Sequence, residues 1–301
     1  MQNSAAIKLE SANQQAARPQ VAKGEAAFGH RLPSGHLICD LCPRFCELAP
    51  GQRGWCQTRY NRRGRLWAAN YNWLSILQFG RIESVPLVEY ANGGVVLKVG
   101  SFGCNFKPQA EREHFGAQVG SGRSFTPLDL ANICRSLVKQ GCIGAAYLFA
   151  EPLMWYEFVM QSAMLLKQCD MCNVLATAGF VNPRPMQELL PYLDAVRFDL
   201  FAFDSAFYRN KMQISFAEVL ISLKLLANSP VHLEVATPLL PGQNDEPEDV
   251  ARIAAYLAQN YGPDIPYHLL APAGELSPEQ KEKIMCCADA AGSILHRVYL
   301  S

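Results

Sequence analysis

The stretch 95-VVLKVGSFGCNFKPQAEREHF-115 decides the fold that this sequence predicts. Its first eight residues are rich in valine and other apolar side chains, a pattern typical of a buried β-strand. The strand leads into Gly103 and Cys104, so a thiol is expected at its carboxyl end. A strand that enters a cysteine-containing loop resembles the entrance to a metallocofactor site. The loop continues with Pro108 and Glu111 and contains no second cysteine.

The rest of the chain alternates short apolar runs with amphipathic segments. Strands are predicted at 95–102, 144–150, 173–179, 195–203, 232–240 and 267–272. Helices are predicted at 127–140, 154–169, 183–193, 216–228, 246–259 and 277–294, with Pro127 at the start of the first and Gly141 just past its end. Repeated βα units with right-handed crossovers predict an α/β fold with a parallel sheet. In the absence of a Gly-rich dinucleotide fingerprint, a curved, incomplete barrel and a flat doubly wound sheet both fit.

Ligands of both kinds of sheet bind at the carboxyl ends of the strands. The predicted ends, at 103–105, 150–152, 177–179, 199–203, 241–244 and 268–272, include Cys104, Glu151, Gly179 and Asp199. Three of these four have a structural alternative to ligand binding. Glu151 can cap a helix N-terminus, Cys104 can be a small buried side chain, and Asp199 can accept backbone hydrogen bonds at the strand end.

A compact cysteine-rich segment, 39-CDLCPRFCELAPGQRGWC-56, precedes the predicted sheet. Cys39, Cys42, Cys46 and Cys56 supply four thiolates, and the prolines and glycines between them turn the chain around a centre. Four soft ligands at close spacing suit tetrahedral zinc or an iron-sulfur cluster, and the spacing does not decide between them. The alternative is a Pro/Gly-rich loop with four unliganded thiols.

The chain holds 11 cysteines, which in a reducing compartment argues for metal ligation and buried thiols rather than disulfides. Cys169 and Cys172 form a CxxC pair, but one continues an apolar helix face and the other opens a strand, which favours core packing over redox chemistry. The same core-packing prediction applies to Cys134, Cys142, Cys286 and Cys287.

Length and charge limit the classes of function. A chain of 301 residues, half of them hydrophobic, fits one large α/β domain with a smaller appendage. Lys plus Arg and Asp plus Glu both total 27, so no net charge recruits nucleic acid or an anionic membrane. The one basic cluster, 59-RYNRRGR-65, is predicted to be a solvated loop. No apolar run approaches the roughly 20 residues that span a bilayer.

The predicted organisation has three parts. Residues 1–30 read as a flexible tail, residues 31–94 as a Cys-rich metal-binding segment, and residues 95–301 as the barrel. The tail lacks the apolar region of a signal peptide, and a cytoplasmic location is therefore expected.

With these motifs placed, the sequence resembles the radical S-adenosylmethionine (SAM) enzymes, and among them the pyruvate formate-lyase-activase-like enzyme of the AmmeMemoRadiSam system. The resemblance runs from about residue 37 to residue 301. It is carried by 39-CDLCPRFC-46, 54-GWCQTRYN-61, 103-GCNF-106, 150-AEP-152, 177-TAG-179, 186-MQELLPYLDAVRFDL-200, 239-LLPGQND-245 and 266-PYHL-269.

The resemblance implies a partial (β/α)6 barrel in which a CxxxCxxC loop after the first barrel strand holds a [4Fe-4S] cluster. The open iron of that cluster chelates SAM, which one electron cleaves to a 5'-deoxyadenosyl radical. In this chain the three cysteine positions fall on Cys104, Pro108 and Glu111. Proline has no side-chain donor atom and glutamate is a hard oxygen ligand, so the cluster is predicted to be absent.

At other positions of the implied site, this chain also differs from the family in ways that disfavour a polar ligand. Glu151 matches the residue that contacts the SAM amino group in the family, and Gly179 matches a nucleotide-facing strand end. Apolar residues replace the polar residues of the family at three other strand ends, namely Phe149 with Ala150, Phe201 with Ala202, and Leu270 with Ala271. A site that no longer binds a polar ligand exchanges polar side chains for packing, because buried unpaired polar groups are costly.

Three functions are compatible with these features. The favoured one is a degenerate radical SAM protein, a pseudoenzyme that acts as a non-catalytic binding or accessory subunit. It would keep the four-cysteine metal site and bind a protein partner, by resemblance a Memo-like or AMMECR-type protein, with SAM or another small nucleotide at the barrel mouth. The second is an active radical SAM enzyme with an atypical ligand set, either Cys104 with Glu111 and His114, or the four N-terminal cysteines. The third, a zinc-stabilised nucleic-acid-binding module, is the weakest because the net charge is zero.

Overall fold

The computed structural model describes residues 24–106 and 122–301. Its centre is an eight-stranded sheet whose strands follow one another in chain order from one edge to the other. The strands are β8 (Ile76–Arg81), β9 (Val95–Gly100), β11 (Cys142–Tyr147), β12 (Cys172–Thr177), β13 (Ala195–Asp199), β14 (His232–Pro238), β15 (Tyr267–Leu270) and β16 (Val298–Leu300). All neighbours from β9 to β16 pair in parallel, and β8 runs antiparallel to β9. Sequential order without a reversal is the order of a partial barrel and not of a doubly wound sheet.

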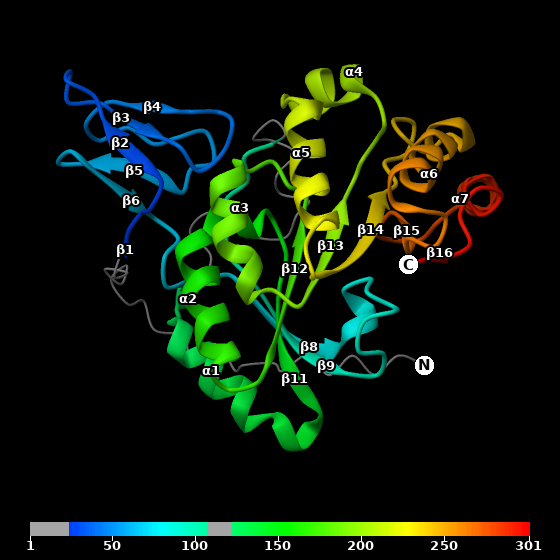
Figure 1. Cartoon of the computed structure of the whole chain (residues 1–301), viewed down its shortest axis with the longest axis horizontal. Coiled ribbons are helices and arrows are strands. Elements are labelled where there is room, and N and C mark those ends of the chain that lie inside the picture. Colours follow the sequence, from blue (N-terminus) through cyan, green and yellow to red (C-terminus); the bar gives the residue numbers. More distant parts are fainter. Residues whose placement is uncertain (1–23, 107–121) are drawn as a thin grey trace.

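Helices cover one face of this sheet, as Figure 1 shows for those on the near side. They are α1 (Pro127–Ser136), α2 (Tyr156–Lys167), α3 (Pro183–Leu189), α5 (Phe216–Ala227), α6 (Pro247–Tyr261) and α7 (Pro278–Gly292), which confirms all six predicted helices. Three short helical turns of the described residues were not predicted: the 3-10 turn Ile82–Ser84, α4 (Ser205–Phe207) and the π-turn Tyr208–Met212. In the described part of the chain, no helix has the length and apolar character needed to cross a membrane.

The segment 82–94, between β8 and β9, covers the opposite face of the sheet. Ile82, Val85 and Leu87 are fully buried there against small and branched side chains of the strands, namely Val96, Ala146, Leu148, Val174, Ala176 and Ala195. The Glu234 carboxylate on β14 accepts hydrogen bonds from three successive backbone amides of this segment, at residues 88, 89 and 90. The face of the sheet opposite the helices is therefore covered by the segment 82–94.

Residues 24–70, which we call the cysteine lobe, form two small three-stranded sheets beside the barrel (Figure 1). The first contains β1 (Gly24–Glu25), β5 (Arg59–Arg62) and β6 (Arg65–Ala68), and the second contains β2 (Gly29–Arg31), β3 (Leu37–Cys39) and β4 (Glu47–Leu48). A further antiparallel pair joins β7 (Trp73–Leu74), which precedes the barrel strands in sequence, to β10 (Arg123–Ser124), which lies between β9 and α1 in sequence.

Three sequence predictions are corrected here. Residues 24–30, assigned to the flexible tail, contain β1 and part of β2, and residues 76–81, assigned to the Cys-rich segment, join the barrel sheet as β8. The basic cluster 59–65 is a β-hairpin and not a loop; Arg62, Arg63 and Arg65 are exposed as predicted, but Arg59 is only 1% exposed. Residues 1–23 and the positions Pro108, Glu111 and His114 lie outside the described residues.

Candidate metal centre and barrel mouth

Two turns of the cysteine lobe bring the four N-terminal cysteines together. Cys39 ends β3, and Cys42 and Cys46 lie in the loop that follows, which is closed by a hydrogen bond from the Cys39 amide to the Cys46 carbonyl at 3.0 Å. Cys56 lies in the turn before β5. Gly54 packs against the first turn, because a Cβ at this position would stand 3.6 Å from Cys46 Sγ.

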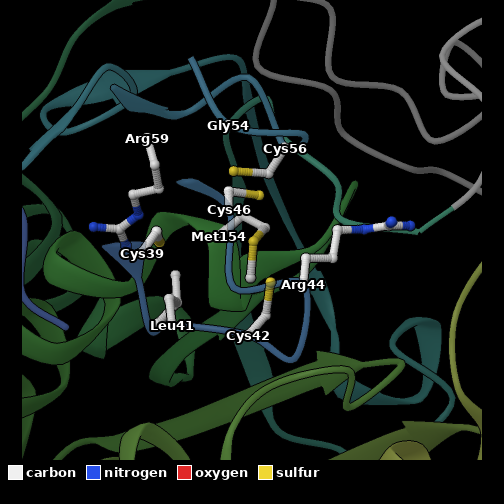
Figure 2. Close-up of a pocket in the computed structure, with 9 residues that line it drawn as sticks. All are labelled: Cys39, Leu41, Cys42, Arg44, Cys46, Gly54, Cys56, Arg59 and Met154. Carbon is white, nitrogen blue, oxygen red and sulfur yellow. The ribbon is translucent and has the colours of Figure 1, made fainter. Parts of the chain in front are cut away.

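The four side chains line one small cavity, shown in Figure 2. Its volume is about 10 Å³, roughly the space of one water-sized sphere, which suits a single ion better than a four-iron cubane. The cysteines are not yet in metal-binding geometry: within residues 24–106 and 122–301, no three His, Cys, Asp or Glu side chains are arranged to hold a metal ion. The ligand set Cys39, Cys42, Cys46 and Cys56 therefore remains a prediction, now with one shared cavity.

Burial disfavours the thiolate form of Cys39, Cys42 and Cys46. It raises the pKa of Cys39 to about 12 and that of Cys42 to about 11, and it also raises the pKa of Cys46. The neighbouring thiols add to each of these shifts, because a second thiolate in the same cavity repels the first. Cys39 and Cys42 are thus neutral at pH 7 unless a cation balances their charge, and metal binding would release protons.

A buried ion pair lies beside this cavity, and the sequence analysis missed it. Arg59 Nη1 donates to Glu157 Oε1 at 2.6 Å, and the two side chains are 1% and 10% exposed. Within the described residues, Arg59 Nε, Arg59 Nη2 and Glu157 Oε2 have no hydrogen-bond partner. Because an unpaired buried donor costs about 1 to 3 kcal/mol, such groups call for an explanation.

The cysteine lobe is fixed to the carboxyl ends of the first barrel strands. Asn70 Nδ2 donates to the carbonyl of Phe102, after β9, at 3.0 Å and to that of Met154, after β11, at 3.1 Å. Gly103 has a φ of +117°, and a Cβ at this position would stand 2.2 Å from Thr58 Cγ2. Glycine is required there because it allows both the backbone conformation and the close approach of the lobe.

The cysteine lobe also forms hydrogen bonds with the segments that follow β12, β9 and β13. The Asn182 amide, after β12, donates to the Leu41 carbonyl at 3.1 Å. Arg44, from the loop between Cys42 and Cys46, donates through Nε to the Asn105 carbonyl at 2.6 Å and through Nη2 to the Gln213 carbonyl at 2.8 Å. The four-cysteine cavity therefore lies over the edge of the sheet where this fold binds ligands.

Glu151 is buried at the end of β11 and is bonded on both oxygens. Oε1 accepts from the Leu153 amide at 3.1 Å and from the Thr177 hydroxyl at 2.7 Å, and Oε2 accepts from the Ala178 amide at 3.1 Å. The helix-capping interpretation is thus confirmed, and the same carboxyl also ties the ends of β11 and β12 together. Burial raises the pKa of Glu151 to about 7.

This raised pKa predicts a pH dependence of stability. The folded pKa of Glu151 exceeds the ordinary value of 4.5, so the folded protein binds the proton more tightly and the free energy of unfolding falls as pH rises from about 4.5 to about 7. The difference of about 2.5 units corresponds to about 3 kcal/mol at most. We expect Glu151→Gln, which does not ionise, to remove this slope in urea unfolding measured between pH 5 and 8. Glu188→Gln, at a residue 46% exposed, is the matched control, and an unchanged slope in Glu151→Gln would refute the assignment.

The other predicted cofactor-binding residues are engaged within the protein. The Cys104 thiol is buried and donates to the Phe106 carbonyl at 3.1 Å. Asp199 binds the Arg197 guanidinium through both oxygens, at 2.8 and 3.0 Å, and no backbone amide among the described residues donates to it, in contrast to the structural alternative. Gly179 adopts a φ of +69°, and a Cβ there would stand 2.3 Å from a ring carbon of Phe198.

The apolar residues that replace polar ones at the strand ends contribute to packing. Phe201 and Ala202 are 1% and 5% exposed, and the Phe201 ring lies 6.1 Å from that of Phe106, in the loop after β9. Ala271, by contrast, is exposed. The ends of β9 and β13 are thus joined by aromatic contact.

The cysteines outside the cavity largely follow the core-packing prediction. Cys286 is the exception, because it is exposed on α7, whereas its neighbour Cys287 is fully buried. The other predicted core thiols are buried or half-buried against the sheet and helices, namely Cys134, Cys142, Cys169 and Cys172.

Known proteins resemble this chain in sequence. It is 27% identical over 248 residues to an uncharacterized protein of Methanocaldococcus jannaschii, across 81% of this chain and 73% of that protein. It is 32% identical over 143 residues to the isethionate sulfite-lyase activating enzyme of Nitratidesulfovibrio vulgaris, across 42% of this chain and 46% of the enzyme. The enzyme of the same name from Desulfovibrio desulfuricans is 29% identical across 40% of each protein. The match thus spans less than half of either activating enzyme.

A solved structure shares the fold. SuiB of Streptococcus suis, crystallised with S-adenosylmethionine, superposes with a TM-score of 0.52 and 11% identity over 68% of this chain and 51% of SuiB. This likeness confirms the predicted fold class, a mostly parallel α/β sheet of partial-barrel type preceded by a cysteine-rich region. No protein-family model matches the chain.

Proposed function

The chain is related to the radical SAM superfamily, and we propose that it is a non-catalytic accessory subunit built on that fold, with one metal ion held by Cys39, Cys42, Cys46 and Cys56. The observation that carries this proposal is that the polar side chains predicted to bind the cofactor are engaged inside the protein. Glu151 bonds to β12 and Asp199 to a neighbouring arginine. Through these bonds Glu151 joins the ends of β11 and β12.

The radical-generating [4Fe-4S] cluster does not fit the residues of the loop after β9. Three thiolates hold that cluster in the enzymes that the sequence resembles, and residues 103–115 supply only Cys104. Its thiol donates to the Phe106 carbonyl, within the same loop. A proline and a glutamate at the other two positions do not replace thiolates. We therefore assign no radical step to this protein.

The four-cysteine site fits a single soft or borderline cation, and we propose zinc. Thiolates bind zinc at about 2.3 Å in a tetrahedron, and the four thiols that line the cavity of about 10 Å³ would move together to form it. A zinc ion would join the two turns of the lobe and hold it over the strand ends. Its role would be structural, because four protein ligands leave no open position.

The remaining parts of the proposal concern partners and location. A protein partner of Memo-like or AMMECR type follows from the resemblance, and SAM or another small nucleotide is a possible ligand at the barrel mouth. Nucleic acid is disfavoured by the zero net charge and by the burial of Arg59 in the one basic cluster. We place the protein in the cytoplasm, where thiols stay reduced.

One observation favours the second candidate function, an active radical SAM enzyme with an atypical cluster. The four-cysteine cavity lies at the barrel mouth, and the Met154 side chain, which follows β11, lines it (Figure 2). A cluster held there would be close to a ligand at the strand ends. One cysteine would have to leave the cluster to open an iron for SAM. The other ligand set, Cys104 with Glu111 and His114, falls mostly outside the described residues.

SAM cleavage distinguishes these functions. The full chain is reconstituted anaerobically with iron and sulfide, reduced with dithionite and supplied with SAM, and 5'-deoxyadenosine is measured. We expect none above the protein-free control. Formation of 5'-deoxyadenosine that is lost in Cys42→Ser but kept in Cys104→Ala would establish the enzyme with an N-terminal cluster. Formation lost in Cys104→Ala would restore the loop after β9 as the cluster site.

A further inference from the structure

The Arg59 guanidinium has more donors than the protein uses. It carries five N–H groups, and those on Nη1 face Glu157, with a bond of 2.6 Å to Oε1. Nε and Nη2 have no partner within the described residues, although the side chain is only 1% exposed and cannot turn to solvent. Three N–H donors are therefore buried without an acceptor.

These donors lie at the four-cysteine cavity. Arg59 lines that cavity, and Figure 2 shows its guanidinium beside Cys39. Besides Glu157, the thiols of Cys39 and Cys56 interact electrostatically with Arg59 and favour its charged form. The second arginine that lines the cavity, Arg44, uses its Nε and Nη2 on backbone carbonyls of the barrel.

Binding of a divalent metal ion would replace the four neutral thiols by a centre of negative charge. Four thiolates around a divalent ion carry a net charge of −2, and thiolate sulfurs accept hydrogen bonds. We propose that Arg59 is the positioning residue of the four-cysteine centre, donating N–H bonds from Nε and Nη2 to the metal-bound sulfurs of Cys39 and Cys56. This inference rests on the proposed metal site and assigns a role to Nε and Nη2 of Arg59, which the contact with Glu157 leaves without a partner among the described residues.

The same arginine connects the centre to the barrel. Glu157 belongs to α2, and its Oε1 also accepts the amide of Ala27 at 2.9 Å. A chain of contacts thus runs from the thiolates through Arg59 to a barrel helix. Lysine would keep the positive charge but not the planar fork that serves a carboxylate and two sulfurs at once.

Metal affinity and the spectrum of a cobalt substitute test this role on the full chain. Zinc affinity is measured by competition with a chromophoric chelator, and the sulfur-to-cobalt charge-transfer band is recorded after Co²⁺ loading. We expect Arg59→Met to weaken zinc binding by about 10-fold or more and to shift the band to longer wavelength, because sulfurs without hydrogen bonds donate electrons more readily. Arg59→Lys should lie between Arg59→Met and the unaltered chain. Arg65→Met, at a residue 66% exposed in the same lobe, is the control and should change neither.

Arg59→Met leaves Glu157 buried without its partner and could fail to fold for that reason. Two further variants keep the proposal testable in that case. Arg59→Met combined with Glu157→Gln removes both charges, which proteins tolerate better than a lone buried charge. We expect this double variant to lose zinc affinity as Arg59→Met does, and Glu157→Gln alone to retain it. A double variant with unaltered affinity and an unshifted band would overturn the role of Arg59 while leaving the metal site intact. An unaltered chain that binds no metal would overturn both proposals.

Discussion

Replacing Glu234 with alanine is expected to lower the free energy of unfolding by about 3 to 5 kcal/mol. The side chain is fully buried, and its two oxygens accept from the backbone amides at 88, 89 and 90 and from the rings of His232 and His268. Alanine would leave these donors without an acceptor and would release the segment 82–94 from the face of the sheet. Urea unfolding at pH 7 gives the change. Glu47→Ala, at a residue 56% exposed, is the control, and a loss below about 1 kcal/mol for Glu234→Ala would show that the segment is held by its apolar contacts alone.

Glu234 also predicts that the free energy of unfolding falls at acid pH. Burial by itself raises the pKa of Glu234, but hydrogen bonds from His232, His268 and the backbone amides outweigh it and lower that pKa to about 2. A carboxyl whose folded pKa is below its ordinary value of 4.5 contributes stability above pH 4.5 and loses it as pH falls towards 2. In Glu234→Gln, the loss of unfolding free energy between pH 4.5 and 2 should be smaller by about 3 kcal/mol. The slope has the opposite sign to that of Glu151, so the two variants separate the two groups.

Replacing Cys42 with serine is expected to reduce bound zinc from about one ion per chain to nearly none. A serine hydroxyl is a poor ligand for zinc at neutral pH, and three thiolates leave the tetrahedron open to water and chelators. The two turns of the cysteine lobe would then lose their common centre. Hydrogen exchange should speed up at the amides of Cys39 and Gly54, which close these turns, while the barrel strands keep their protection.

Cys104→Ala is the matched control for this prediction. Its thiol is as buried as that of Cys42, but it donates to the Phe106 carbonyl and does not line the cavity. Zinc content should not change in this variant. Loss of bound metal in Cys104→Ala, or an unchanged zinc content in Cys42→Ser, would contradict the four-cysteine site.

The barrel was predictable because its signals are local. Each of the six predicted strands is a short apolar run, and four of the helices between and after them, α1, α3, α6 and α7, begin with a proline. At α1, for example, Thr126 and Asp129 form a capping box in front of Pro127, and Gly141 adopts a φ of +85° just past the helix. The spacing of the four cysteines was equally local, and the fold places them around one cavity.

The buried charges were not predictable because their partners are distant. Arg59 sits in a basic run that looks solvated, and its partner Glu157 is 98 residues away on a barrel helix. Glu234 meets a segment that precedes it by 144 to 146 residues. Composition and periodicity carry no information about such pairs, because charge complementarity appears only when the chain is folded.

The ion pair of Asp199 could have been predicted from the sequence. Arg197 and Asp199 are two residues apart on a strand and so share one face, where opposite charges pair. The structure joins them through two hydrogen bonds. This periodicity favoured an internal ion pair for Asp199 over a ligand.

Zinc, iron and acid-labile sulfide per chain, measured on protein purified anaerobically and again after reconstitution, test the central proposal most directly. We predict about one zinc per chain and no iron or sulfide, which would mean a structural four-cysteine site on a barrel without a radical-generating cluster. About four irons per chain with matching sulfide would contradict the proposal and establish an iron-sulfur protein.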